Sequence, residues 1–260
     1  MKEPTAISKY GLDLINISPQ DYWWNFLREP REAYVEDEKT IFEKAFRCAV
    51  LQPEEFKKKY VECPKFDKRN PHQKTEYLSL LSRCEANNQI LLEFDYKGNS
   101  YYKMIIDMQK AVEKHSVAKV LFSTGNIGFA EILIEPESGA YVEFTPHWVS
   151  GDIIVNLMST GDATEDYFQK EVLDKKLHKK AAIHMDGLHK HTFIFVNVEK
   201  TQPCKIAVRV LDEDAIELGR MEYTNNCRTY MECLESGIWP GLPEKITQLS
   251  LPNWAFKDKD

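Results

Sequence analysis

Apolar residues recur every three or four positions through the first third of the chain, which is the spacing of an amphipathic helix. The pattern is clearest over residues 36–51, where one predicted helical face carries Ile41, Phe42, Ala45, Phe46, Ala49 and Val50. Ser18 and Pro19 predict an earlier helix start, because serine caps helices and proline favours the first helical position. The same region is expected to contain a short helix from Pro53, a loop over residues 57–72, and helices over residues 73–85 and 95–116, the last capped by Asp95.

From about residue 128 the pattern changes to short apolar runs separated by turn residues, which is typical of strands. Predicted strands cover residues 130–134, 140–144, 152–157, 191–198 and 204–211, and predicted helices cover residues 164–189 and 212–236, the second ended by Gly237. This order predicts one α/β domain over residues 1–260, with a mixed sheet flanked by helices. Residues 1–127 form its mainly helical part, and residues 128–260 form its sheet-containing core.

Composition narrows the function classes. The chain has 260 residues, 43% of them hydrophobic and 29% charged, and no apolar run reaches the roughly 18 residues of a membrane span. The N-terminus lacks the basic and apolar regions of a signal peptide, and the six cysteines form no CxxC pair, so we expect a cytoplasmic protein with reduced thiols and no membrane partner. A net charge of −7 argues against a general nucleic-acid coat, although it leaves room for a local basic groove.

One segment has the outline of a metal-dependent nuclease core. It consists of an apolar strand over residues 141–144 ending near Pro146, and a second strand over residues 152–157 followed by Ser159 and Thr160. Such a core needs an acid after the proline, an acid in the second strand and a lysine two residues later. This chain has His147, Asn156 and Met158 at those places, so the scaffold is present without its chemistry.

The chain also resembles the RecE family, or exonuclease VIII, over nearly its whole length. The two most specific matches are the block at residues 50–56 and the ending at residues 239–255. The resemblance implies the PD-(D/E)XK nuclease fold, exonuclease activity on double-stranded DNA, a phage or prophage background, a ring-shaped homo-oligomer and a partner that anneals single strands.

The resemblance also identifies five positions at which the chain departs from the family pattern. Where the family has a histidine on a helix, this chain has Arg47, and where the family has an aspartate after the proline, it has His147. In place of the family's aspartate and lysine on the second strand, it has Asn156 and Met158. A glutamine on the following helix corresponds to Lys180. These are the degenerate site positions, and we expect no catalytic residue among them.

The departures are expected to lower metal affinity by orders of magnitude. Mg²⁺ prefers carboxylate and water oxygens, whereas Asn156 offers a neutral carbonyl oxygen and His147 offers a nitrogen that suits transition metals. At an effective dielectric constant of about 20, each lost charge pair is worth roughly 4 kcal/mol before desolvation. Met158 cannot stabilise developing charge as lysine does. We therefore expect no cofactor, and Mg²⁺ only if a site has been rebuilt.

A rebuilt metal site would draw on His147, Asp152 and Glu131, with Glu143 nearby. Asp152 lies four residues before Asn156, which places it about 13 Å along the strand, too far to replace Asn156 without a bulge.

Candidate DNA-binding residues are Arg47 and a basic run formed by Lys175, Lys176, Lys179 and Lys180. For the run, the alternative is a solvated helix face, and Arg47 has the alternative of pairing with a carboxylate such as Glu43.

Three hypotheses about function follow. In the first, the protein is a catalytically inactive relative of RecE-type exonucleases that binds DNA ends or joins a recombination complex. In the second, it is a protein-binding module that inhibits a host nuclease or defence complex. In the third, it is an active metal-dependent exonuclease with a rebuilt site.

Overall fold

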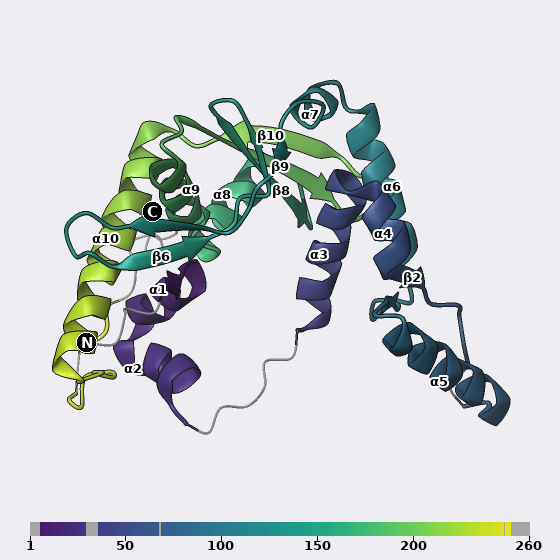
Figure 1. Cartoon of the computed structure of the whole chain (residues 1–260), viewed down its shortest axis with the longest axis horizontal. Helices are drawn as coiled ribbons and strands as arrows, with labels where there is room; N and C mark the ends of the chain where they lie inside the picture. Colours follow the sequence, from purple (N-terminus) through teal and green to yellow (C-terminus); the bar gives the residue numbers. More distant parts are fainter. Residues whose placement is uncertain (1–5, 30–35, 68, 247, 251–260) are drawn as a thin grey trace, which may run out of the picture.

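A five-stranded sheet forms the centre of the molecule (Figure 1). The computed structural model describes residues 6–29, 36–67, 69–246 and 248–250. The strand order is β10-β9-β8-β7-β4, with β4 at Asn126–Ile127, β7 at Trp148–Ser150, β8 at Ile153–Thr160, β9 at Thr192–Glu199 and β10 at Ile206–Val210. β8 and β9 pair in parallel along their whole length, and the other neighbours are antiparallel. The predicted mixed α/β architecture is confirmed.

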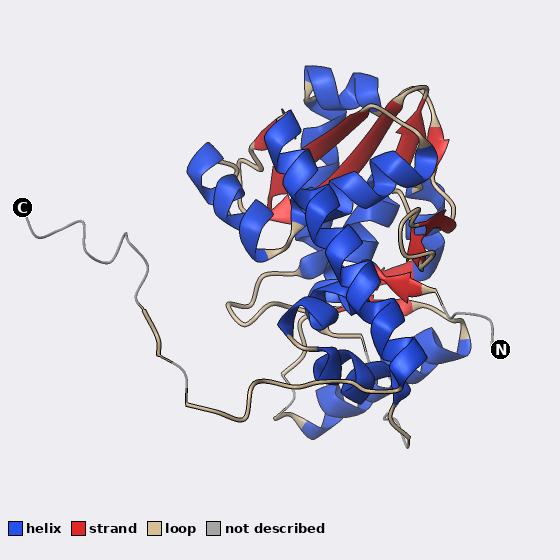
Figure 2. Ribbon diagram, turned by 90° about the vertical axis from the view of Figure 1, so that its left-hand side faces the viewer, coloured by secondary structure: helices blue, strands red, loops and turns tan. Residues whose placement is uncertain are grey.

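Helices cover both faces of β8 and β9, and Figure 2 shows helices lying across the sheet. Ile154 and Phe193 face a core built with α8 (Glu165–Asp174), α9 (Leu177–Leu188) and α10 (Glu213–Ser236). Val155 and Val196 face a second core built with α3 (Glu38–Leu51), α4 (Pro53–Lys59), α6 (Tyr101–Lys114) and α7 (Ser116–Leu121). Burial on both faces explains why the sequence of β8 reads as a continuous apolar run.

The predicted hairpin at residues 130–144 is present but does not belong to this sheet. It forms β5 (Glu131–Ile134) and β6 (Tyr141–Phe144) of a separate three-stranded sheet, whose third strand is β1 (Ile7–Ser8). The chain leaves β6 through Thr145 and Pro146, and proline cannot donate to a strand ladder. A two-residue strand such as β1 is too short to show a period, so the pattern of apolar residues could not predict it.

Two local predictions in the helical part are wrong. α6 begins at Tyr101 with Ser100 as its cap, and Asp95 instead accepts hydrogen bonds from the backbone amides of Lys97 and Asn99, which close a turn. The expected loop over residues 57–72 contains the end of α4, β2 (Tyr60–Glu62) and the start of α5 (Pro71–Ala86). β2 pairs in parallel with β3 (Ile90–Leu92), and this non-local pairing overrides the polar sequence around it.

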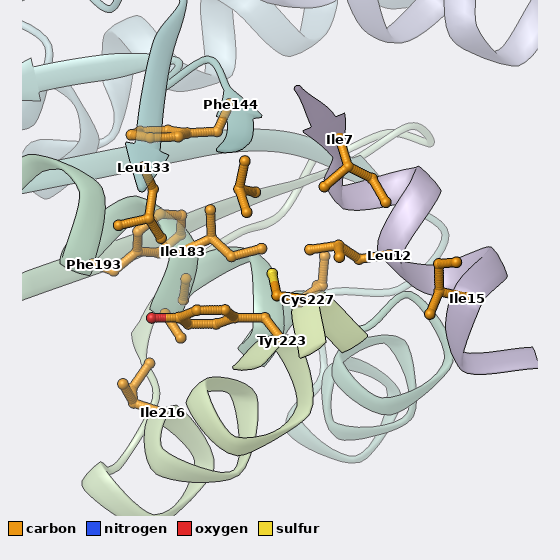
Figure 3. Close-up of a cluster of buried hydrophobic side chains, with 14 of the residues drawn as sticks. Ile7, Leu12, Ile15, Leu133, Phe144, Ile183, Phe193, Ile216, Tyr223 and Cys227 are labelled. Carbon is orange, nitrogen blue, oxygen red and sulfur yellow. The ribbon is translucent and has the colours of Figure 1, made fainter. Parts of the chain in front are cut away.

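The N-terminal helices pack against α10. Ser18 caps α2 (Pro19–Tyr22), as predicted, and α1 (Lys9–Ile17) precedes it. Ile7, Leu12 and Cys227 belong to one apolar core, and Figure 3 shows Leu12 beside Cys227. Gly237 ends α10 in the left-handed conformation, as predicted. Residues 251–255 of the C-terminal motif lie outside the described residues. Within the described ranges, no helix is long and apolar enough to cross a membrane.

A buried lysine ties these helices together. Lys179 of α9 is completely buried, and its ammonium donates to Asn226 Oδ1 of α10 at 2.8 Å and to Asp13 Oδ1 of α1 at 3.1 Å. Glu222 Oε2 of α10 lies 3.6 Å away. A buried charge is costly unless it is paired and hydrogen-bonded, so this network fixes α1 and α10 relative to α9.

We expect Lys179→Met to lower the free energy of unfolding by about 3 kcal/mol, because it removes two charge-assisted hydrogen bonds of a buried ammonium, to Asp13 and to Asn226. Urea denaturation followed by circular dichroism measures this. The matched control is Lys176→Met, which removes a half-buried lysine with one Glu222 contact at 3.5 Å. A loss below about 1 kcal/mol for Lys179→Met, the size of an exposed pair, would contradict the assigned role.

Candidate functional site

The site lies where the pairing between β7 and β8 stops. In this antiparallel pair Trp148 is opposite Val155, so the same register places His147, just before β7, beside Asn156. Beyond Asn156, no described strand pairs with β8 on that side. This edge of β8 is therefore open to side chains from the helices on the two faces of the sheet.

Four of the five predicted site positions come together here. Arg47 Nη1 of α3 lies 2.5 Å from His147 Nε2, and Lys180 Nζ of α9 lies 3.4 Å from the same nitrogen. Lys180 Nζ also donates to Asn156 Oδ1 at 2.6 Å. Because α3 and α9 cover opposite faces of the sheet, the two cations reach His147 from two sides. We call Arg47, His147, Asn156 and Lys180 the cationic cluster.

Met158 does not take part in this cluster. It is buried in the apolar core that also contains Ile154 and Phe195. Its neighbour in the register on β9 is Asn197, which is completely buried and whose amide atoms have no hydrogen-bond partner. The place predicted for a catalytic lysine is thus filled by ordinary packing.

The hydrogen-bond pattern fixes the state of His147. Both cations approach Nε2 as donors, so this nitrogen carries the lone pair and the ring is neutral, with its proton on Nδ1. Burial holds the pKa of His147 well below its usual value, and the nearby charges of Lys180 and Arg47 lower it further. The pKa of the buried His184 is also held well below its usual value, by burial and by Lys180.

The two cations are destabilised by their surroundings. Burial lowers the pKa of Lys180 to about 7, with a further contribution from Arg47. Burial also lowers the pKa of Arg47, and Glu43 offsets part of that effect. The causes are physical: removal from water and proximity of like charges both disfavour the charged form.

Among the described residues, the hydrogen bonds of both cations go to neutral acceptors. Arg47 does not form the ion pair with Glu43 that the sequence allowed, since its Nε donates to the backbone oxygen of Glu43 at 3.3 Å. The Glu43 carboxylate instead accepts hydrogen bonds from the backbone amide and the hydroxyl of Ser159 on β8. The cluster therefore holds two half-buried cations whose direct hydrogen-bond acceptors are neutral, and the nearby Glu43 carboxylate offsets only part of the cost of their charge.

The cationic cluster does not fit a metal ion. The oxygen of Asn156 and the lone pair of His147 already accept hydrogen bonds from cations, and these are the atoms that a metal would need. In the parts of the chain that the structure describes, no three His, Cys, Asp or Glu side chains are grouped so that they could hold a metal.

The residues suggested for a rebuilt metal site are not brought together. Glu131 and Glu143 are exposed on the three-stranded sheet, and Asp152 is exposed in the turn before β8. Asp152 Oδ1 accepts a hydrogen bond from the backbone amide of His191 at 3.4 Å. Because the strands expected to form one sheet form two, Glu131 and Glu143 do not converge on His147, and Asp152 lies before the start of β8, four residues from Asn156.

The predicted basic run is not a single DNA-binding face. Lys176 is in the left-handed conformation between α8 and α9, so the helical face is interrupted there. Lys175 pairs with Glu171 at 2.5 Å, and Lys176 lies 3.5 Å from Glu222. The expectation for Lys179 is wrong, because this residue is completely buried. Of the four lysines, Lys180 is the one that joins the cationic cluster.

A groove of about 710 Å³ leads to the cluster, and it includes residues that the sequence analysis missed. Arg47 and His147 line it, together with Lys44, Lys59 and Tyr60. These three residues come from α3, α4 and β2, and β2 is held by its pairing with β3. The three consecutive lysines at residues 57–59 could have indicated a basic surface. They were predicted to lie in a loop, so nothing in the sequence placed them beside His147.

We expect the pH dependence of the free energy of unfolding to report the cost of keeping Lys180 charged in the folded protein. Its pKa is about 7 in the folded protein and about 10.4 in an unfolded chain, so the unfolded state binds more protons between these values and stability rises with pH there. In Lys180→Met this contribution is absent, so its stability relative to wild type is greatest near or below pH 7 and declines toward about pH 10.

Chemical denaturation over this pH range tests that expectation. Lys39→Met, at an exposed position of α3, is the control and should keep the wild-type slope. A wild-type slope retained in Lys180→Met would show that another group is responsible.

Comparisons with known proteins agree with the fold. No protein-family model matches the sequence, and no curated protein matches it. Among solved structures, a "Putative exonuclease" from Eubacterium rectale has a TM-score of 0.59 and 10% identity, over 98% of this chain and 94% of that chain. An alkaline exonuclease (LHK-Exo) from Laribacter hongkongensis, alone and in complex with dAMP, matches 74% of this chain and 91% of its own with 13% and 12% identity, but TM-scores of 0.28 and 0.27 are too low to carry an argument. The chain shares its fold with the Eubacterium rectale protein.

Proposed function

We propose that the protein is a RecE-related, nuclease-fold protein that binds DNA without hydrolysing it. The observation that carries the proposal is the cationic cluster, in which Lys180 and Arg47 hold the nitrogen and oxygen atoms that a metal would need. The fold shared with the Eubacterium rectale protein supports the nuclease ancestry. The motifs at residues 50–56 and 239–255 support the RecE relationship and, with it, a role in phage recombination or interference with host defence.

Loss of hydrolysis follows from electrostatics. A divalent cation entering the cluster would meet Arg47 and Lys180 in place of carboxylates. At about 4 Å and an effective dielectric constant of about 20, each pair of unit charges repels by roughly 4 kcal/mol, and a divalent ion doubles that value. Without a metal or a lysine at position 158, the site lacks both a means to activate water and a group that stabilises the transition state.

DNA binding is supported by the charge distribution in the groove. Lys44, Lys59 and Arg47 line the groove, with Glu55 as its acidic residue. DNA affinity rests largely on neutralising phosphates with such side chains. A net charge of −7 disfavours DNA binding over the surface as a whole, so we expect binding at a local basic groove such as this one.

The first test is degradation of linear duplex DNA. We expect the substrate to remain intact when purified protein is added with Mg²⁺ or Mn²⁺, as judged by gel electrophoresis. Degradation that increases with protein concentration, and that Lys180→Gln or Arg47→Gln abolishes, would establish the active-nuclease alternative.

The second test is binding of the same DNA, followed by fluorescence anisotropy in the absence of divalent ions. We expect binding that weakens with salt and loses about tenfold in affinity in Lys59→Gln, whereas Lys39→Gln, an equal charge loss outside the groove, binds as wild type does. No binding at low salt, together with a protein that co-purifies from the native host, would favour the protein-binding alternative.

A further inference from the structure

The cationic cluster has more donors than acceptors. His147 Nε2 has a single lone pair, yet Arg47 lies 2.5 Å and Lys180 lies 3.4 Å from it. One lone pair cannot make a good hydrogen bond with two cations at once. Lys180 has one further acceptor, Asn156 Oδ1, and Arg47 has the backbone oxygen of Glu43. All of these acceptors are neutral.

Donor hydrogens remain on both side chains. An ammonium carries three hydrogens and a guanidinium carries five. Lys180 uses two of its hydrogens on Asn156 and His147, and Arg47 uses its Nε and Nη1 on Glu43 and His147. Because both cations approach the same nitrogen, one tetrahedral anion can contact both. The groove gives an anion access to Arg47 and to the His147 ring, whose Nε2 lies 3.4 Å from Lys180 Nζ.

We infer that Arg47 and Lys180 bind a phosphate group directly, without a metal ion, and that the phosphate takes over from His147 as the acceptor for both cations. A phosphate supplies several charged oxygens where the imidazole supplies one neutral lone pair, and arginine matches phosphate geometry with two donors. The inference deepens the proposed DNA-binding function by naming the group that is bound, and it rests on that function only for the macromolecule that carries the phosphate.

Binding is expected to depend on pH through Lys180. The charged and titratable groups around its ammonium are Arg47 and Glu43 of α3, His147 before β7, His184 of α9, and Lys9 of α1. In the absence of an anion, the pKa of Lys180 is about 7. Because an anion favours the ammonium form, affinity falls as pH rises and Lys180 loses its proton.

Calorimetric titration of the chelator-treated full chain tests the inference, with inorganic phosphate and sulfate as probes. We expect saturable binding without metal, weakened at least about tenfold in Arg47→Gln and in Lys180→Gln. Lys39→Gln on α3 should bind as wild type does. Circular dichroism confirms that each variant is folded, and Lys180→Gln should fold because it relieves a buried charge. Absence of binding to wild type, or binding unaffected by both substitutions, would overturn the inference.

Sulfate separates the titration of Lys180 from that of phosphate itself, since sulfate keeps its charge between about pH 6 and pH 9. We expect sulfate affinity to fall by about tenfold or more over this range in wild type, since Lys180 titrates within it. Lys180→Gln should bind weakly with little change in affinity over the same range. A pH-independent wild-type affinity would overturn the assigned role of Lys180.

Oligonucleotides with a 5′-phosphate or a 5′-hydroxyl identify the source of the phosphate. Preference for the 5′-phosphate assigns the cluster to strand ends, and equal binding by both, still lost in Arg47→Gln, assigns it to internal phosphates. The two proposals fail separately. Phosphate binding without DNA binding would remove the proposed function and keep the phosphate site, whereas DNA binding unaffected by Arg47→Gln and Lys180→Gln would do the reverse.

Discussion

Burial of β8 on both faces is the constraint on which the rest of the structure depends. A strand covered on both sides has no water for its polar side chains, so each must find a partner within the protein. Ser159 bonds to Glu43 of α3, Thr160 bonds to Glu171 of α8, and Asn156 accepts from Lys180 of α9. The helices are thus attached to β8 by polar contacts as well as by apolar packing, and the candidate site is one of these contacts.

These contacts explain how the site can keep its shape under the proposed loss of hydrolysis. A carboxylate pair without its metal would repel itself, whereas an amide and a neutral imidazole can accept hydrogen bonds from lysine and arginine. The neutral acceptors do not balance the two cations, because Arg47 and Lys180 share one imidazole nitrogen and the pKa of Lys180 is lowered to about 7. The cationic cluster therefore carries positive charge, whereas a metal ion requires negatively charged ligands.

Sequence reasoning succeeded where the signal was local. The amphipathic spacing of residues 36–51, the cap at Ser18 and the stop at Gly237 all predicted elements that the structure contains. Arg47, His147, Asn156 and Lys180 were identified as site positions although they are far apart in the chain, because the resemblance to RecE related them to one site.

Long-range arrangement was beyond the same reasoning. The division of the strands between two sheets, the pairing of β2 with β3 and the burial of Lys179 all depend on contacts between distant segments. Lys179 shows why: four lysines in one run read as a solvated surface, and only the position of Asp13 and Asn226 reveals that one of them is internal. The prediction that Asp95 caps a helix was wrong for a local reason, since an aspartate side chain stabilises a turn and a helix cap equally well.

Arg47 and Lys180 belong to helices on opposite faces of the central sheet, and this makes their meeting point a joint between the two helical layers. An anion held by both residues would fasten α3 to α9 around the free edge of β8. Binding of the anion would also stabilise the contact between the two helical layers, since any ligand that binds only the folded state stabilises it. The scaffold would then be more rigid when the anion is bound than when the groove is empty.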